Sequence, residues 1–174
     1  EAHHLGCPPL DHCFLNLLDT HAHLSSFNLA YPFNRIQEAG FTCSRYGALK
    51  VEQEDAGVER DRLCDWLKNL PKPIALLAAM DNRARQVIDA CNWADISVPQ
   101  EIAILGVDNE SDLCDNTNPP MSSILLNAER ASYDAAAYLD KLMRGTTTLR
   151  KVITYGPSHV VSRRSTASCG FSPM

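Results

Sequence analysis

The stretch IALLAAMDNRAR, which runs from Ile74 to Arg85, decides the fold class of this chain. Its first six residues form an unbroken apolar run, which is typical of a parallel strand covered on both faces. After a polar turn, apolar residues recur at helical spacing, at Ala84, Val87, Ile88 and Cys91. A buried strand that leads directly into a helix is the repeating unit of parallel α/β proteins.

The same alternation extends along the chain in both directions. A helical stripe precedes the stretch, at Leu63, Trp66, Leu67 and Leu70, and Pro71 ends it. The segments that follow are predicted as a strand over Ile102 to Val107, a strand over Ser122 to Leu126, a helix over Ala131 to Leu142 that Gly145 ends, and closing strands over Val152 to Tyr155 and His159 to Val161. This order predicts an α/β fold with a doubly wound parallel sheet.

The first 57 residues give a weaker pattern. Cys13 to Leu18 and Phe41 to Tyr46 are candidate strands, and Phe27 to Ala39 is a candidate helix that Gly40 would end. Pro32 lies inside that helical stretch, where it would remove a backbone hydrogen bond.

Composition limits the possible functions. The 174 residues, 45% of them hydrophobic, are enough for one domain with a core, and they fit a piece of a longer protein. The net charge is −5 and no run of Lys and Arg exceeds two residues, so DNA contact is expected only through a domain outside this chain. Seven scattered cysteines without a CxxC pair predict reduced thiols in a cytoplasmic protein. No apolar run approaches the length of a membrane span.

Polar residues follow two of the predicted strands at the point where each strand ends. Asp81 and Asn82 come after the first apolar run, and Asp108 and Asn109 come after the second. Ligands of open parallel sheets bind beyond the carboxyl ends of the strands. An ionised aspartate accepts hydrogen bonds from adjacent hydroxyls, which suits the diol of a sugar. Two structural alternatives remain: Asp81 caps the following helix, or Asp108 and Asn109 only make a turn.

A different site is suggested by LLDTHAHL, from Leu17 to Leu24. Its histidines, His21 and His23, are similar to the HxH motif at the first strand of metal-dependent amidohydrolases, in which both side chains bind one divalent metal. That barrel needs roughly 250 residues and further ligands on later strands. We therefore expect no metal and no cofactor, and a hydrolase that uses His21 and His23 is the enzyme alternative.

Five segments, in order, resemble the effector-binding domain of LacI/GalR-type transcription regulators, and among these the xylose-operon regulators. The segments are RLCDWLKNLP from Arg62, AMDNRAR from Ala79, VPQEIAILGVDNE from Val98, PPMSSI from Pro119 and RRST from Arg163. They cover the chain from Arg62 to Thr166, and the first third of the chain matches the family only loosely.

The resemblance implies a type I periplasmic-binding-protein-like fold that senses a sugar effector, with xylose or another pentose as the candidate, and that is not an enzyme. It implies that residues 1–126 form mainly the C-terminal lobe, that residues 127–166 belong to or cross back from the N-terminal lobe, and that 167–174 are a tail. Two-lobed regulators of this kind are expected to be homodimers whose DNA-binding domain lies outside this chain. A transport-type sugar-binding protein is the nearest alternative.

The resemblance also assigns residues. It matches Asp108 to the family's sugar-binding aspartate and Asp81 to the aspartate of its AxxD turn. Met80 stands where many relatives have Asn or Thr, and Leu29 stands where the family has an arginine. Both differences concern usual contact positions and therefore bear on which sugar is bound.

Overall fold

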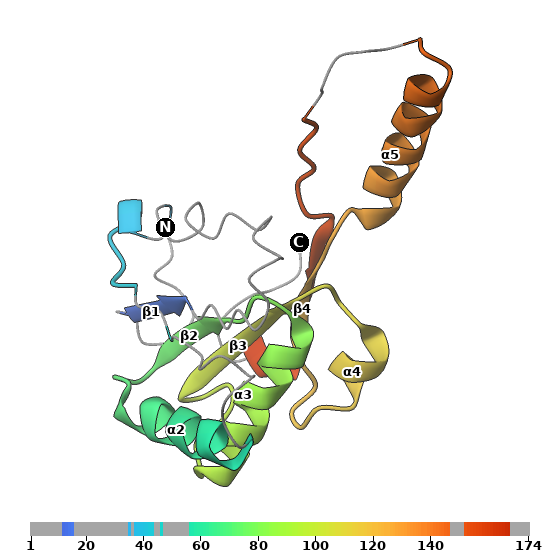
Figure 1. The fold of residues 1–174 in the computed structure, drawn as a ribbon. Helices are drawn as coiled ribbons and strands as arrows, with labels where there is room; N and C mark the ends of the chain where they lie inside the picture. The colour runs from blue at the N-terminus through green and yellow to red at the C-terminus, as the bar shows by residue number, and fades with distance from the viewer. Residues whose placement is uncertain are drawn as a thin grey trace.

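A computed structural model describes residues 12–15, 35, 37–43, 46, 56–146 and 152–167 of the chain. Five strands form one sheet in the order β1-β2-β3-β4-β5 (Figure 1). They are β1 (His12–Leu15), β2 (Ile74–Leu77), β3 (Ile102–Val107), β4 (Ser122–Leu125) and β5 (His159–Val161). The first four strands are parallel, and β5 pairs antiparallel with β4.

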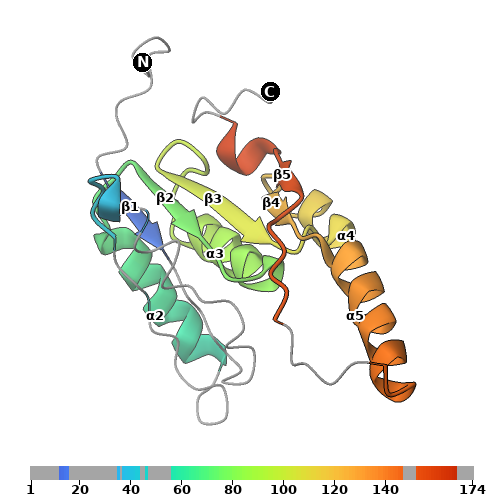
Figure 2. The same cartoon turned by 90° about the horizontal axis from the view of Figure 1, so that it is seen from above.

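Two helices cover one face of this sheet (Figures 1 and 2). They are α2 (Ala56–Asn69) and α3 (Asp81–Trp93). Because the described strands follow one another in chain order, right-handed crossovers place both helices on the same side. Their apolar stripes point inward, so that Leu67 of α2 and Ile88 of α3 are fully buried, together with Ile74 of β2 and Ile104 of β3.

Two shorter elements lie beside the end of the sheet. The helix α4 (Ser111–Asp115) follows β3, and the 3-10 turn η1 (Arg164–Thr166) follows β5. Ser165 of η1 is buried, accepts a hydrogen bond from the Ser122 N–H (2.8 Å) and donates one to the Ile104 carbonyl (2.6 Å). These two bonds attach the end of the described chain to the middle of the sheet.

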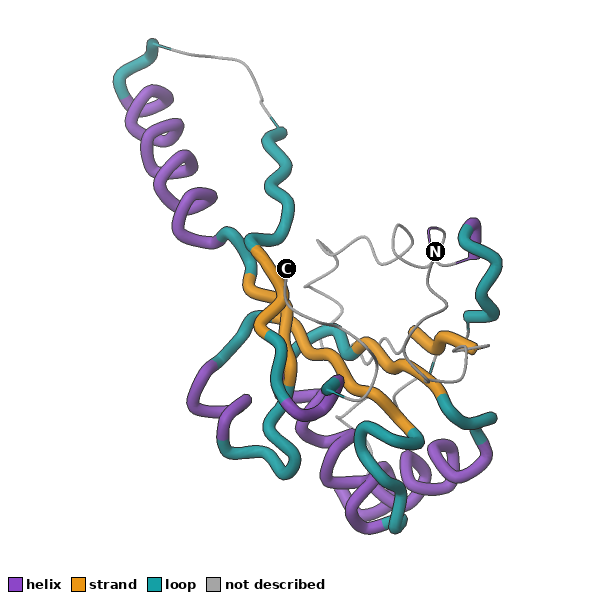
Figure 3. Tube along the Cα trace, turned by 180° about the vertical axis from the view of Figure 1, so that it is seen from behind, coloured by secondary structure: helices purple, strands orange, loops and turns teal. Residues whose placement is uncertain are grey.

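The helix α5 (Ala128–Met143) extends away from the sheet (Figures 1 and 3). None of its residues is buried, and Tyr133 and Met143 are 71% and 79% exposed. Its polar contacts include the ion pair of Arg130 with Asp134 at 2.9 Å and a hydrogen bond that the Tyr155 hydroxyl donates to Asp134 (2.7 Å). No helix within the described parts of the chain is both long and apolar enough to cross a membrane.

Most of the predicted elements from residue 56 onward are confirmed. The second apolar run is β3 with the predicted bounds, and the strands predicted to begin at Ile74 and Ser122 form β2 and β4, ending slightly earlier. The parallel α/β class is likewise confirmed. The described strands follow one another across the sheet in chain order, without a reversal.

Two expectations differ from the structure, and two others lie partly or mostly outside the described residues. The strand predicted over Val152 to Tyr155 is absent because this segment lies beside α5, beyond the sheet, where Val152 is 92% exposed. The segment between the strands β3 and β4, for which the sequence predicted no helix, contains α4, whose backbone bond from Cys114 N to Glu110 O closes a helical turn. Within 41–46, only Thr42 has a strand-like bridge among the described residues, and most of the expected helix over 27–39 lies outside them.

We predict that Leu67→Ala destabilises the chain by about 2–5 kcal/mol, because it removes a fully buried side chain between α2 and the sheet. Val58→Ala on the same helix is the control, since Val58 is 53% exposed and its loss is expected to change the free energy of unfolding by less than about 0.5 kcal/mol. Urea denaturation followed by circular dichroism measures both. Equal effects of the two substitutions would contradict the core described here.

Candidate functional site

The carboxyl ends of β2 and β3 meet at one edge of the sheet, and the predicted site residues come together there. Asp81 begins α3 shortly after β2, and Asp108 follows β3 directly. Because β2 and β3 are parallel neighbours, their ends point the same way. The sequence order alone therefore brings these two carboxylates to one edge, as expected.

The carboxylate of Asp81 is enclosed and fully hydrogen-bonded. Its Oδ1 accepts a bond from the Ser123 hydroxyl (2.6 Å), and its Oδ2 accepts bonds from the Glu110 N–H (2.7 Å) and the Cys114 thiol (3.4 Å). Asp81 is only 1% exposed. One alternative held that Asp81 caps the helix that follows it, but its side chain does not do so. Asp81 instead joins the start of α3 to β4 and to the loop before α4. Both side-chain oxygens of Asp81 therefore accept hydrogen bonds from groups within the protein.

Two neighbours are adapted to this buried carboxylate. A Cβ at Gly106 would overlap Oδ1 of Asp81, so only glycine fits at this position of β3. Burial, followed by the charge of Asp81 and the hydrogen bond to it, raises the pKa of the Cys114 thiol to about 12. The thiol therefore remains protonated and available as a donor.

Asp108 is the exposed carboxylate of the pair. Its backbone has φ 107°, a region that side chains other than glycine rarely adopt, and its N–H donates to the Ile124 carbonyl at 3.0 Å. Within the described part of the chain, no side chain hydrogen-bonds or ion-pairs with its carboxylate. Partial enclosure raises the pKa of Asp108 above its usual range, and the nearby charges of Asp81 and Glu110 raise it further. The strand exit therefore carries an acceptor with a strained backbone and no side-chain partner among the described residues.

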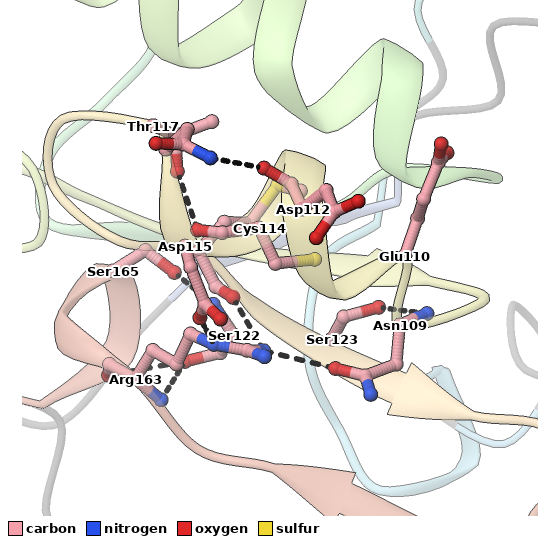
Figure 4. A network of polar contacts seen from close by, with 12 residues as sticks. Asn109, Glu110, Asp112, Cys114, Asp115, Thr117, Ser122, Ser123, Arg163 and Ser165 are labelled. Carbon is pink, nitrogen blue, oxygen red and sulfur yellow. Dashed lines mark hydrogen bonds and ion pairs between the residues drawn. The ribbon is translucent and has the colours of Figure 1, made fainter.

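Asn109 completes the turn and is held on two sides. It also has positive φ, at 53°. Its N–H donates to the Ser123 hydroxyl (3.0 Å), and its side-chain oxygen accepts a bond from Arg163 Nη1 (2.9 Å) (Figure 4). The turn alternative for Asp108 and Asn109 therefore describes their backbone correctly. The side-chain oxygen of Asn109 faces Arg163.

The other predicted positions differ in their surroundings. Asn82 is exposed on the first turn of α3, and Met80 is partly buried, with its carbonyl accepting the N–H groups of Arg83 and Ala84. His21, His23 and Leu29 lie outside the described residues. Among the residues that the structure does describe, no group of three or more His, Cys, Asp or Glu side chains could hold a metal ion.

Two important residues were not singled out from the sequence. Ser123 joins Asp81 to Asn109 through one hydroxyl, and Arg163 bonds the side chain of Asn109. Both lie in segments that carry the family resemblance, PPMSSI and RRST, but their partners are 14 to 54 residues away in sequence. Only the paired strands bring them together.

Comparisons with known proteins identify the family of the chain. A family model, the periplasmic binding protein-like domain, matches residues 29–166. The xylose operon regulatory protein of Haemophilus influenzae is 30% identical over 149 residues, which is 86% of this chain and 38% of that protein. The protein of the same name from Escherichia coli K12 is 31% identical over 121 residues, 70% of this chain and 31% of that protein. The chain thus spans about a third of the length of these regulators.

Solved structures show the same fold. A xylose-binding transcription activator superposes with a TM-score of 0.80 at 24% identity, covering 95% of this chain and 43% of that one. A LacI family transcriptional regulator from Arthrobacter, in complex with lactose, has a TM-score of 0.71 at 23% identity and covers 91% of this chain and 59% of its own. At these identities the superpositions establish the fold.

We predict that Asp81→Asn destabilises the fold by about 2–4 kcal/mol, because an amide must turn its NH₂ group toward one of the three donors around this site. Asp95→Asn is the control: it makes the same chemical change at an exposed residue whose positive φ asparagine tolerates. Denaturant titration of both variants gives the comparison. A stability of Asp81→Asn equal to that of Asp95→Asn would show that the charge is not needed there.

We predict the opposite sign for Asp108→Asn. For a carboxyl group whose pKa is higher in the folded than in the unfolded state, the free energy of unfolding falls as the pH rises through the folded pKa. The ionised form of Asp108 therefore makes the folded protein less stable. Removing the charge should therefore stabilise the protein at pH 7, and by less at pH 4.5, close to the ordinary aspartate pKa of about 3.9. Urea midpoints at both pH values test this. A variant that is less stable than the parent at pH 7 would contradict it.

Proposed function

The chain belongs to the family of periplasmic binding protein-like domains, and on that premise we propose that it senses a sugar for a LacI-type transcription regulator. The observation that carries the proposal is Asp108, an exposed carboxylate at the end of a buried strand, without a partner among the described side chains. Such strain and charge persist where function requires them. The proposed role is binding, with no catalysed reaction, in line with the binding domain that names the family.

The ligand chemistry follows from the acceptors at this edge. An ionised carboxylate accepts hydrogen bonds from two adjacent hydroxyls of a sugar, and these bonds are charge-assisted. Asn82 and the backbone of Asn109 lie in the segments next to the Asp108 carboxylate. Asp81 supports the turn through its hydrogen bonds with the Ser123 hydroxyl and the Glu110 N–H. The two relatives regulate xylose operons, so a pentose, with D-xylose first, is the effector that we propose.

The domain arrangement is also a proposal. In it, residues 1–126 are mainly one lobe, 127–166 belong to or cross back from a second lobe, and 167–174 are a tail. The exposed apolar side chains on α5, among them Tyr133, Leu139 and Met143, support an assignment of this helix to the second lobe. The regulator would act in the cytoplasm as a homodimer, with DNA bound by a domain outside this chain. The net charge of −5 supports that last point.

The rival functions have less support. A transport-type sugar-binding protein would share the family, but both regulators described above act on gene expression by name. A hydrolase would need the metal site at His21 and His23 together with ligands on later strands. The aspartates that follow β2 and β3 are Asp81 and Asp108, and they instead make the arrangement described for the candidate site.

We predict that Asp108→Asn in the full-length protein weakens binding of D-xylose by roughly ten- to a hundredfold, since each lost charge-assisted bond is worth about 1.5–3 kcal/mol. Induction should be lost, while DNA binding persists. Calorimetry against a panel of pentoses and hexoses is the measurement, with Asp112→Asn as a matched control at an exposed position on α4. Equal affinity in Asp108→Asn and parent would remove Asp108 from the site, and no sugar binding by the parent would refute the sensor.

A further inference from the structure

One guanidinium joins three segments around the candidate site. Arg163 Nη1 donates to the side-chain oxygen of Asn109 (2.9 Å) and to the Met121 carbonyl (3.0 Å), and Nε donates to Asp115 (2.6 Å) (Figure 4). The side chain is 13% exposed. It therefore connects the turn after β3, the start of β4 and the end of α4.

The backbone of Arg163 is fixed independently of these contacts. Its N–H donates to the Ser122 hydroxyl (2.7 Å), and its carbonyl lies 3.1 Å from the same oxygen. Ser165, two residues later, is bonded to the backbones of β3 and β4. The arginine thus extends from a rigid base, as a side chain must if it is to hold another group in place.

The turn at Asp108 and Asn109, which Arg163 contacts, would relax if the contacts that hold it were lost. Asp108 and Asn109 have consecutive positive φ values, 107° and 53°. Residues in such regions persist only where their surroundings hold them. The carboxylate of Asp108 also lies near the like charges of Asp81 and Glu110, which favour movement away. The restraint comes through Asn109, from Ser123 at its N–H and from Arg163 at its side chain.

We propose that Arg163 is a positioning residue of the effector site: by holding the Asn109 side chain, it keeps Asp108 in the conformation that presents its carboxylate to the ligand. The ligand part of this statement rests on the proposed function. Arg163 itself does not contact the effector. Its action differs from that of Asp81, which supports the same turn through Ser123 and the Glu110 N–H.

Calorimetry with D-xylose tests the proposal in the full-length protein. Arg163→Gln should weaken binding by roughly three- to thirtyfold, the range for residues that act through another. Arg163→Lys keeps the charge but not the planar guanidinium fork that reaches Asn109 and Asp115 together, so it should also weaken binding. It serves as the second variant if Arg163→Gln does not fold. The neighbouring, exposed Arg164→Gln is the matched control, expected to bind normally. An equal loss in Arg164→Gln, or no loss in both Arg163 variants, would overturn the proposal.

Two further variants separate the contacts of Arg163. Asp115→Ala removes the partner of Nε and should leave D-xylose affinity unchanged, because that residue is not part of the turn. Asn109→Gly removes the side chain that Arg163 holds, and in this background Arg163→Gln should have no additional effect. Additive losses in the double variant would show that Arg163 acts by another route and would overturn the proposal.

A measurement without sugar distinguishes this inference from the proposed function. NMR titration of the Asp108 carboxyl carbon reports its pKa directly. If Arg163→Gln releases the turn, the carboxylate moves away from Asp81 and Glu110, and its pKa falls toward the ordinary value. Loss of a nearby positive charge alone would instead raise it. A lowered pKa in a protein that binds no D-xylose would refute the sugar sensor and retain the positioning role, whereas an unchanged or raised pKa would overturn that role.

Discussion

The hydrogen bonding of the buried Asp81 carboxylate is the interaction on which the sheet edge with the candidate site depends. A buried charge is tolerated only when it is hydrogen-bonded, and here three donors from β4, from the loop before α4 and from α4 itself surround it. This requirement explains Gly106, which leaves room for the carboxylate, and the protonated thiol of Cys114. One residue at the start of α3 thus joins α4, the loop before it and β4.

The two aspartates at this edge show how one residue type takes opposite roles. Asp81 is enclosed and satisfied, and it stabilises the fold. Asp108 is exposed, strained and close to like charges, so the folded state is less stable because of it. Proteins retain such residues where activity needs them. Asp81 accepts a hydrogen bond from Ser123, whose hydroxyl accepts the Asn109 N–H, while Arg163 separately holds the side chain of Asn109.

The helix α5 differs from the other long helices in having no buried side chain. Its apolar residues are exposed, while α2 and α3 bury theirs against the sheet. An amphipathic helix gains most of its stability from the packing of its apolar face. This contrast is the physical basis for proposing that α5 belongs to a second lobe, in a chain that spans about a third of the length of the regulators it resembles.

Sequence periodicity alone determined the α/β class, the strands β2 to β4 and the helices α2, α3 and α5, because unbroken apolar runs and helical stripes report burial directly. It also placed Asp81 and Asp108 at one edge, since parallel strands end together. The short helix α4 and the roles of Ser123 and Arg163 could not be found in this way. They depend on contacts between residues far apart in the chain, and no local pattern records which donor reaches which acceptor once the strands have paired. Only the tertiary structure decided that Asp81 is enclosed and Asp108 exposed.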